Sequence, residues 1–191
     1  MLNKIQFGQN DILVCAGDYI DCGPKSFEMM EWIMNAPSNV VFVRGNHDEE
    51  FAAAIDIMKI ICNKAELNPD DAEDSKTLYN AVSLLCKENK NDFFDYYGTI
   101  GKLIKEDNVV FSELCSWADK VTEMPYFYKM TIDDRTCIVV HAGYIESLED
   151  ADTEEKYNNP EAFYLYARDD AYMCGGIEHG MIIAGHTPTT A

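Results

Sequence analysis

The sequence predicts an α/β fold, and two observations lead to this prediction. A helical pattern covers 26–34, between Pro24 and Pro37, and separates two apolar runs of strand length. A strand, a helix and a second strand in this order form a βαβ unit with parallel strands. Four such runs, mostly β-branched, occur at 12–16, 40–43, 137–140 and 181–184. We expect them to be buried strands of one sheet system.

The middle of the chain, from about 49 to 122, lacks the alternation of strands and predicts helices. The expected helices cover 49–63, 75–88, 92–105 and 112–122. A hairpin follows, because 127–132 alternates, 133–135 has turn residues and 136–140 is apolar again. No repeat or linker interrupts the chain, so we predict a single domain over 1–191 with a helical insert at about 49–122.

The composition excludes several classes of protein. The chain has 15 Lys and Arg against 34 Asp and Glu, a net charge of −19, which excludes a general nucleic-acid binder. It has no apolar run of about 18 residues and no apolar leader, so we expect neither a membrane partner nor secretion. Seven cysteines without a Cys-x-x-Cys pair predict free thiols and a cytoplasmic location.

Polar side chains with metal-ligand or acid–base chemistry follow each predicted strand. They are Asp18 and Asp21 after the first run, Asn46 and His47 after the second, His141 after the third and His186 after the fourth. In an open α/β sheet the carboxyl ends of strands line the ligand crevice, so we expect these groups to converge. Mixed carboxylate, amide and imidazole ligands suit Mn²⁺, Fe or Zn²⁺. The pattern therefore indicates a hydrolytic metal centre.

Four short segments carry a family resemblance. Gly17-Asp-x-x-Asp-Cys-Gly23, Gly45-Asn-His-Asp48, His141-Ala-Gly143 and Gly185-His-Thr187 resemble the motifs of the calcineurin-like metallophosphoesterases. Residues 17–26 most resemble the bacterial serine/threonine protein phosphatases of the phosphoprotein phosphatase type. The resemblance implies a four-layer α/β/β/α sandwich of two mixed sheets. It also implies a metal-dependent hydrolase of phosphomonoesters, in which a metal-bound hydroxide attacks in line. The substrate would be a phosphorylated protein or peptide, or a small phosphoester.

The resemblance assigns two divalent metal ions to the site. Mn²⁺ is the first choice, and Fe and Zn²⁺ are the alternatives. By this resemblance Asp18 bridges the two ions. Asn46, His141 and His186 complete the coordination of the second ion.

The resemblance also assigns acid–base and phosphate-binding roles. His47 would be the general acid that protonates the leaving alkoxide, and Asp21 the carboxylate that orients and charges its imidazole. Arg168 would hold the substrate phosphate, because a guanidinium matches phosphate bidentately. The alternative for Arg168 is a surface side chain paired with Asp169 or Asp170.

The sequence departs from the family pattern in three places. The first motif, Gly-Asp-x-His-Gly, is missing before Asp18, so the first metal site is expected to be incomplete. The chain also stops shortly after His186, before the expected C-terminal strands. We interpret the chain as a fragment of a longer gene product, incomplete at both ends, with natural truncation as the alternative. Cys22 stands where the family has a phosphate-contacting Arg, which predicts a lost phosphate contact or, alternatively, a reactive thiol.

Two other functions fit the same motifs. A bis(5'-nucleosyl)-tetraphosphatase has this fold, and the products formed from a diadenosine polyphosphate or a phosphopeptide would separate it from a protein phosphatase. A catalytically impaired phosphoprotein-binding domain is favoured by Cys22 and by the missing first motif. Phosphopeptide binding without turnover would identify that case.

Overall fold

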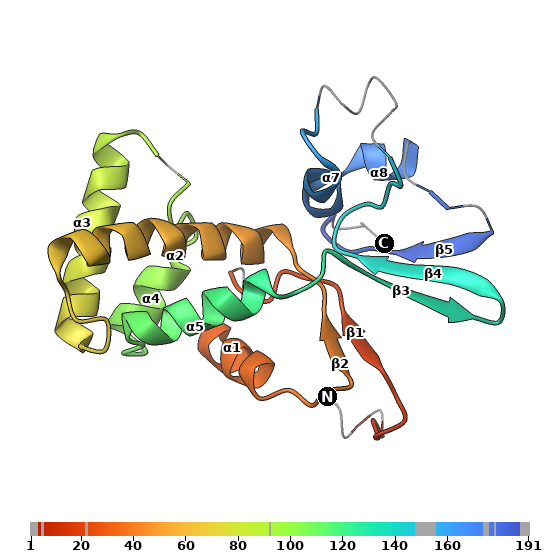
Figure 1. Cartoon of the computed structure of the whole chain (residues 1–191), viewed down its shortest axis with the longest axis horizontal. Coiled ribbons are helices and arrows are strands. Elements are labelled where there is room, and N and C mark those ends of the chain that lie inside the picture. The colour runs from red at the N-terminus through yellow and green to blue at the C-terminus, as the bar shows by residue number, and fades with distance from the viewer. Residues whose placement is uncertain are drawn as a thin grey trace. The chain divides into compact units, whose positions relative to one another are not determined.

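The computed structural model of the chain describes residues 4, 6–21, 23–91, 93–147, 156–173, 176–177 and 179–187. The chain divides into two compact units. Unit 1 comprises 1–18, 35–46 and 124–191, and unit 2 comprises 19–34 and 47–123. Figure 1 labels the strands, which belong to unit 1, and the helices of both units.

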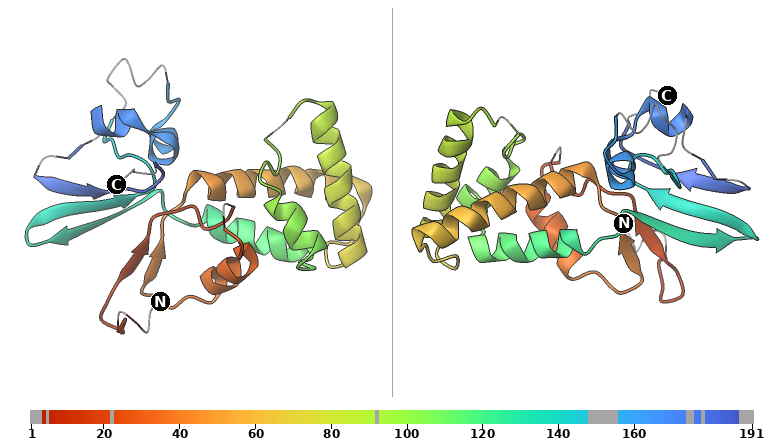
Figure 2. Two further views of the ribbon diagram at one scale, coloured as in Figure 1. Left: turned by 180° about the vertical axis from the view of Figure 1, so that it is seen from behind. Right: turned by 45° about the horizontal axis from the view of Figure 1, so that its top comes forward.

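Unit 1 contains two sheets. β1 (Leu13–Cys15) pairs in parallel with β2 (Val40–Phe42), with Val14 opposite Val41. β3 (Phe127–Ile132) and β4 (Arg135–Val140) form the predicted antiparallel hairpin, and β4 also pairs in parallel with β5 (Gly180–Ile183). Both views of Figure 2 show these three strands side by side.

The expectation of one sheet system is therefore wrong. The described strands form two sheets, the number that the family resemblance implies. β3 and β5 occupy both edges of β4, so β1 and β2 pair with each other and not with β4. The expectation of burial also fails for β5, since Met181 and Ile183 are about half exposed at the edge of their sheet. β4 is buried over 137–140, as predicted.

Aromatic side chains form the core of unit 1 against β4. Tyr144 and Tyr164 stack with ring centroids 5.7 Å apart, and Phe127 packs edge-on against both. Tyr164 lies on α7 (Pro160–Tyr166), which begins with Asn159 as N-cap and Pro160 in the first turn. The backbone carbonyl of Tyr164 accepts a hydrogen bond from Ala142 N, so this core anchors the residue that follows His141. The shorter helix α8 (Asp169–Met173) comes next.

Unit 2 contains helices in the positions that the sequence predicted, with one difference. They are α1 (Ser26–Met34), α2 (Asn46–Ala65, whose first residue belongs to unit 1), α3 (Ala72–Glu88), α4 (Thr99–Lys105) and α5 (Phe111–Thr122). The helix expected at 92–105 begins only at Thr99. Gly98 precedes it with φ of 73°, and the Asp95 carboxylate accepts from Ile100 N and Gly101 N, so a carboxylate cap starts the helix later.

Large apolar side chains from all five helices fill the core of unit 2. They include Met30, Ile55, Leu78, Leu103 and Trp117, each at most 1% exposed. Phe27 of α1 packs against Trp117 of α5 with ring centroids 6.0 Å apart. The helical segment thus has a core of its own, which is consistent with the predicted insert.

The architecture is mixed α/β, with two sheets and several helices, and it confirms the predicted fold class. It is consistent with the fold of the metallophosphoesterases that the motifs resemble. The single domain over 1–191 stays a prediction. Each described helix is either too short or too polar to cross a lipid bilayer.

Candidate metal centre and acid–base pair

Two glycines allow the chain after β1, the chain after β2 and His141, which follows β4, to lie close together. Gly17 has φ of 91°, and a Cβ on it would lie 2.7 Å from both Gly45 Cα and His141 Nδ1. A Cβ on Gly45 would overlap the backbone nitrogen and the carboxylate of Asp18. Only glycine fits at these two positions, because any side chain would separate the strand ends that carry the polar groups.

His141 lies at the end of β4, where its imidazole is 1% exposed. Its Nδ1 lies 2.9 Å from the backbone oxygen of Ala16. A carbonyl only accepts hydrogen bonds, so Nδ1 carries the proton and donates it. With the proton of a neutral ring on Nδ1, Nε2 has a lone pair, and this tautomer can bind a metal ion through Nε2.

Three electron-pair donors surround Nε2 of His141. Asn46 Oδ1 lies 3.0 Å away, His186 Nδ1 lies 2.9 Å away and Asp18 Oδ2 lies 3.4 Å away. The two oxygens cannot donate a hydrogen bond, and one shared proton cannot satisfy all the lone pairs at once. A divalent cation accepts all of them together, so this donor set fits a metal ion.

The distances within the cluster also fit a single cation. One ligand atom each from Asp18, His141 and His186 lies within 4.8 Å of the other two. Two imidazoles, one carboxylate and the oxygen of Asn46 suit Mn²⁺, Fe or Zn²⁺ rather than Ca²⁺. Among the described parts of the chain, this is the one group of three such residues with metal-binding spacing. Asp18, Asn46, His141 and His186 thus converge in unit 1, as the sequence predicts for residues that follow strands.

The backbone at the cluster adopts unusual conformations. Asp18 and His186 have φ of 57° and 61°, in the left-handed region that non-glycine residues rarely enter. Gly185 N donates to His141 O at 2.8 Å, which holds the turn that carries His186 beside His141. Such conformations cluster at functional sites, where the surrounding structure maintains them.

A second group of predicted residues meets in unit 2. His47 Nδ1 lies 2.9 Å from Asp21 Oδ2, and both side chains are largely buried. The Thr99 hydroxyl donates to the other carboxylate oxygen, Asp21 Oδ1. With both oxygens engaged, the carboxylate is held in one orientation, and it stabilises a protonated imidazole whose Nε2–H is then an acid.

Two further contacts hold the acid–base pair. The Tyr97 ring packs against the His47 ring with centroids 4.8 Å apart. The fully buried Asp48 carboxylate accepts from Tyr19 N at 3.0 Å, which ties the first turn of α2 to the segment that leads to Asp21. Asp21 itself has φ of 64°. The conformation of the loop from Tyr19 to Asp21 is therefore set by tertiary contacts rather than by local backbone preference.

The remaining predicted residues stand apart from these two groups. Arg168 is exposed between α7 and α8, and its phosphate-binding role stays a prediction. Asp170, considered as its surface partner, accepts instead from Lys156 Nζ and from Tyr157 Oη. Cys22 lies outside the described residues.

Sequence reasoning missed the residues that support the two groups. Thr99 and Tyr97 lie in the helical segment, in no recognised motif, so no pattern indicated their contacts with Asp21 and His47. Asp48 belongs to the Gly45-Asn-His-Asp48 motif, which assigns it no role, although its place directly after the predicted acid is a usable signal. The contact of Ala16 O with His141 depends on the fold alone.

Two comparisons with known proteins bear on the family of the chain. The family model of calcineurin-like phosphoesterases matches residues 1–189. A symmetrical bis(5'-nucleosyl)-tetraphosphatase from Buchnera aphidicola subsp. Baizongia pistaciae is 41% identical over 54 residues. That match spans 28% of this chain and 19% of the relative, so the chain covers well under two thirds of the relative's length.

Proposed function

The chain belongs to the calcineurin-like phosphoesterase family, and on this premise we propose that it is a metal-dependent hydrolase of phosphoesters. The observation that carries the proposal is the convergence of Asp18, Asn46 and His186 on the Nε2 atom of His141. These four residues would hold a divalent cation, for which we propose Mn²⁺. Such an ion lowers the pKa of a coordinated water and neutralises charge on phosphoryl oxygens.

The proposed ligands have separate tasks. Asp18 would supply the negative charge that attracts the cation, and of the four proposed ligands only its carboxylate would be able to contact a second ion as well. Ala16 O keeps the proton of His141 on Nδ1, so that Nε2 stays available as a ligand. Asn46 supplies a neutral oxygen, which leaves net positive charge on the bound ion for the substrate.

We assign the general acid to His47. A phosphate ester releases an alkoxide, which is a poor leaving group until it receives a proton. Asp21, held by Thr99, accepts from His47 Nδ1 and favours the imidazolium form. The proton that is transferred would then be the one on Nε2. His47 directly follows Asn46 in the chain, so the proposed acid is covalently joined to a proposed metal ligand.

For the substrate class, we propose phosphorylated serine or threonine in proteins. The support is the Gly-Asp-Tyr-Ile-Asp-x-Gly-Pro-Lys-Ser stretch at 17–26, which resembles the bacterial protein phosphatases. A second candidate is hydrolysis of dinucleoside polyphosphates, because the matching relative is a bis(5'-nucleosyl)-tetraphosphatase. A phosphoserine peptide and diadenosine tetraphosphate, offered separately, distinguish the two by release of inorganic phosphate or of nucleoside diphosphate.

The test is Mn²⁺-dependent hydrolysis of p-nitrophenyl phosphate by the chain and by its His47→Asn variant. We expect hydrolysis that requires Mn²⁺ and that falls about 100-fold or more in the variant. His179→Asn is the matched control, because His179 is exposed and lies outside both groups. Hydrolysis that is independent of metal, or equal in the His47 and His179 variants, would refute the proposal.

A further inference from the structure

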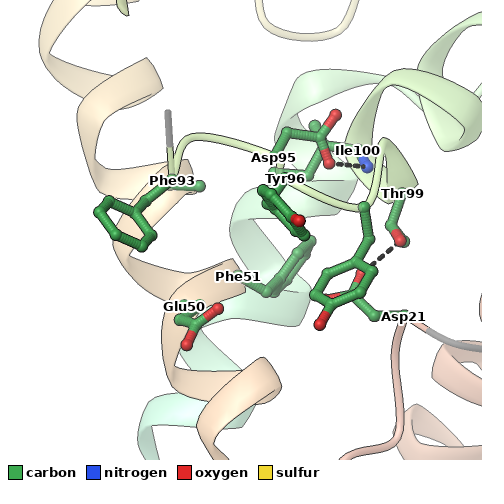
Figure 3. A pocket seen from close by; sticks show the side chains of 10 residues that line it. Asp21, Glu50, Phe51, Phe93, Asp95, Tyr96, Thr99 and Ile100 are labelled. Carbon is green, nitrogen blue, oxygen red and sulfur yellow. Dashed lines mark hydrogen bonds between the residues drawn. The ribbon is translucent and has the colours of Figure 1, made fainter. Parts of the chain in front are cut away.

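A small pocket in unit 2 lies beside the proposed acid. It is shallow and open to solvent, with a cavity volume of about 20 Å³, and Asp21 and Thr99 form part of its wall. Figure 3 shows Glu50 and Phe93 on one side, Asp21 and Thr99 on the other, and Phe51 and Tyr96 between them. The inference below rests on the proposed function, since His47 would protonate the leaving group next to this pocket.

Aromatic rings dominate the pocket and remain open to solvent. Phe93, Tyr96 and Tyr97 are 85%, 71% and 50% exposed, while Phe51 is buried. Tyr96 and Tyr97 pack edge-on with centroids 5.1 Å apart, and Tyr97 also contacts the ring of His47. Three adjacent exposed rings leave apolar surface uncovered, which is unusual unless a ligand or partner covers it.

The acidic residues of the pocket indicate the charge of a ligand that would bind there. Of its ten described lining residues, Asp21, Glu50 and Asp95 are acidic and none is basic. Asp21 is bonded to His47 and Thr99, while Asp95 accepts from Ile100 N, Gly101 N and Tyr79 Oη. All three carboxylates contribute negative potential, and the side chain of Glu50 is exposed to solvent.

Acidic groups beside aromatic faces attract cations and repel anions. A leaving group with further phosphates, such as a nucleoside diphosphate, would place negative charge next to three carboxylates. A positively charged side chain would gain from both the ring faces and Glu50. The charge complementarity therefore favours a basic phosphopeptide over a polyphosphate.

We propose that this aromatic pocket binds the guanidinium or ammonium group of an Arg or Lys close to the phosphorylated residue of a phosphoprotein substrate. Glu50 pairs with the cation, and the rings of Phe93 and Tyr96 lie against it. The pocket is thus a specificity-determining subsite for the leaving-group side of the substrate.

The kinetic test compares three phosphoserine peptides. They differ at one position near the phosphoserine, where they carry Arg, Gln or Glu. We expect kcat/KM to be about fivefold higher for the Arg peptide than for the Gln peptide, and lowest for the Glu peptide. In Glu50→Gln and in Tyr96→Ala the Arg-to-Gln ratio should fall toward one. Glu88→Gln, an exposed change at the end of α3, should keep the ratio. Because each ratio is taken within one variant, changes in basal activity cancel.

A binding test decides the inference even if the chain hydrolyses nothing. Acetyl-arginine amide, acetyl-glutamine amide and adenosine are titrated while the ring NMR signals of Phe93, Tyr96 and Tyr97 are followed. We expect the arginine compound to shift these signals, the glutamine compound to leave them in place, and Glu50→Gln to weaken the effect.

The two proposals fail in different ways. Absence of metal-dependent hydrolysis of p-nitrophenyl phosphate overturns the proposed function and leaves the binding test to decide the subsite. Hydrolysis without any preference among the peptides overturns the subsite alone. Stronger shifts from adenosine than from the arginine compound would also overturn it, in favour of a stacked nucleobase.

Discussion

The metal cluster of unit 1 and the acid–base pair of unit 2 are built in different ways. The cluster collects one side chain from each of four strand ends or strand-following turns, and two glycines allow the close approach. The pair joins His47 to Asp21 and is held by side chains from the helical segment, Thr99 and Tyr97. The difference shows that the cluster depends on strand ends, whereas the pair also depends on Tyr97 and Thr99, at the start of α4, which belong to no motif.

Removing a ligand from the cluster should have the largest effect. In His141→Ala we expect Mn²⁺-dependent hydrolysis of p-nitrophenyl phosphate to fall by more than about 100-fold. Even mutation of a residue that only hydrogen-bonds to a metal ligand typically lowers metal affinity or activity by about 10- to 100-fold. The Mn²⁺ concentration needed for half-maximal activity should also rise. Activity at the wild-type level, measured over a wide Mn²⁺ range, would exclude His141 as a ligand.

Removing the proposed acid, His47, should lower activity without affecting metal binding by the cluster. In His47→Asn we expect kcat to fall about 100-fold, while the affinity for Mn²⁺ stays within about twofold of wild type. Isothermal titration with Mn²⁺ and initial rates on the same protein sample give both quantities. A parallel loss of metal affinity and activity would make His47 part of the cluster and would remove the distinction between the regions.

A methyl group at Gly45 should disturb the cluster without removing any ligand. A Cβ there overlaps Asp18, so in Gly45→Ala we expect about tenfold weaker Mn²⁺ binding and a loss of about 1–3 kcal/mol in the free energy of unfolding. Gly176→Ala is the control, because no atom of the described residues lies within 4 Å of a Cβ at Gly176. Equal behaviour of the two variants in urea unfolding and metal titration would contradict the close-approach argument.

Removing the Thr99 hydroxyl should affect the His47–Asp21 pair and leave the metal cluster unchanged. Thr99→Val keeps the shape of the side chain but leaves Asp21 Oδ1 without this donor, so we expect kcat to fall about threefold to tenfold. Thr99→Ser should restore most of the rate, and Mn²⁺ affinity should not change in either variant. If serine fails to rescue the rate, the hydroxyl is not the group that matters.

The smallest effect concerns pH and Asp95, which caps α4. Burial is the main cause that raises the pKa of its carboxyl above the usual range, so the folded chain holds this proton more tightly than the unfolded chain. The contribution of Asp95 to stability is therefore greatest below its unfolded pKa, about 3.9, and declines as pH rises toward its folded pKa. In Asp95→Asn this part of the pH dependence should disappear from the free energy of unfolding, measured in urea at a series of pH values.

The same contrast explains how much the sequence predicts. The helix at 26–34 and the hairpin at 127–140 have clear periodicity, and the structure confirms both. Residues 93–98 also look helical, but the cap by Asp95 and the left-handed Gly98 delay the start of α4. Pairing of β4 with β5 on one edge and β3 on the other is a long-range choice, so the number of sheets does not follow from local pattern.

For the candidate site, the residues that follow strands were predictable and their supporting contacts were not. Strand ends bring Asp18, His141 and His186 together by topology, which a sequence displays as repeated apolar runs before polar residues. Thr99 and Asp21 are 78 positions apart in the chain, and the sequence around either residue gives no indication of their hydrogen bond. The exposed rings of Tyr96 and Tyr97 are likewise indistinguishable in sequence from buried ones.

A divalent cation should bind at His141 and His186 and not at the His47–Asp21 pair. The chain has four histidines, at 47, 141, 179 and 186, so the ring ¹⁵N signals can all be assigned by single substitutions. In a titration with diamagnetic Zn²⁺, we predict large shifts for Nε2 of His141 and for the ring of His186. Nδ1 of His141 should stay protonated, and His47 and His179 should keep their signals. Shifts at His47 with none at His141 would contradict the account.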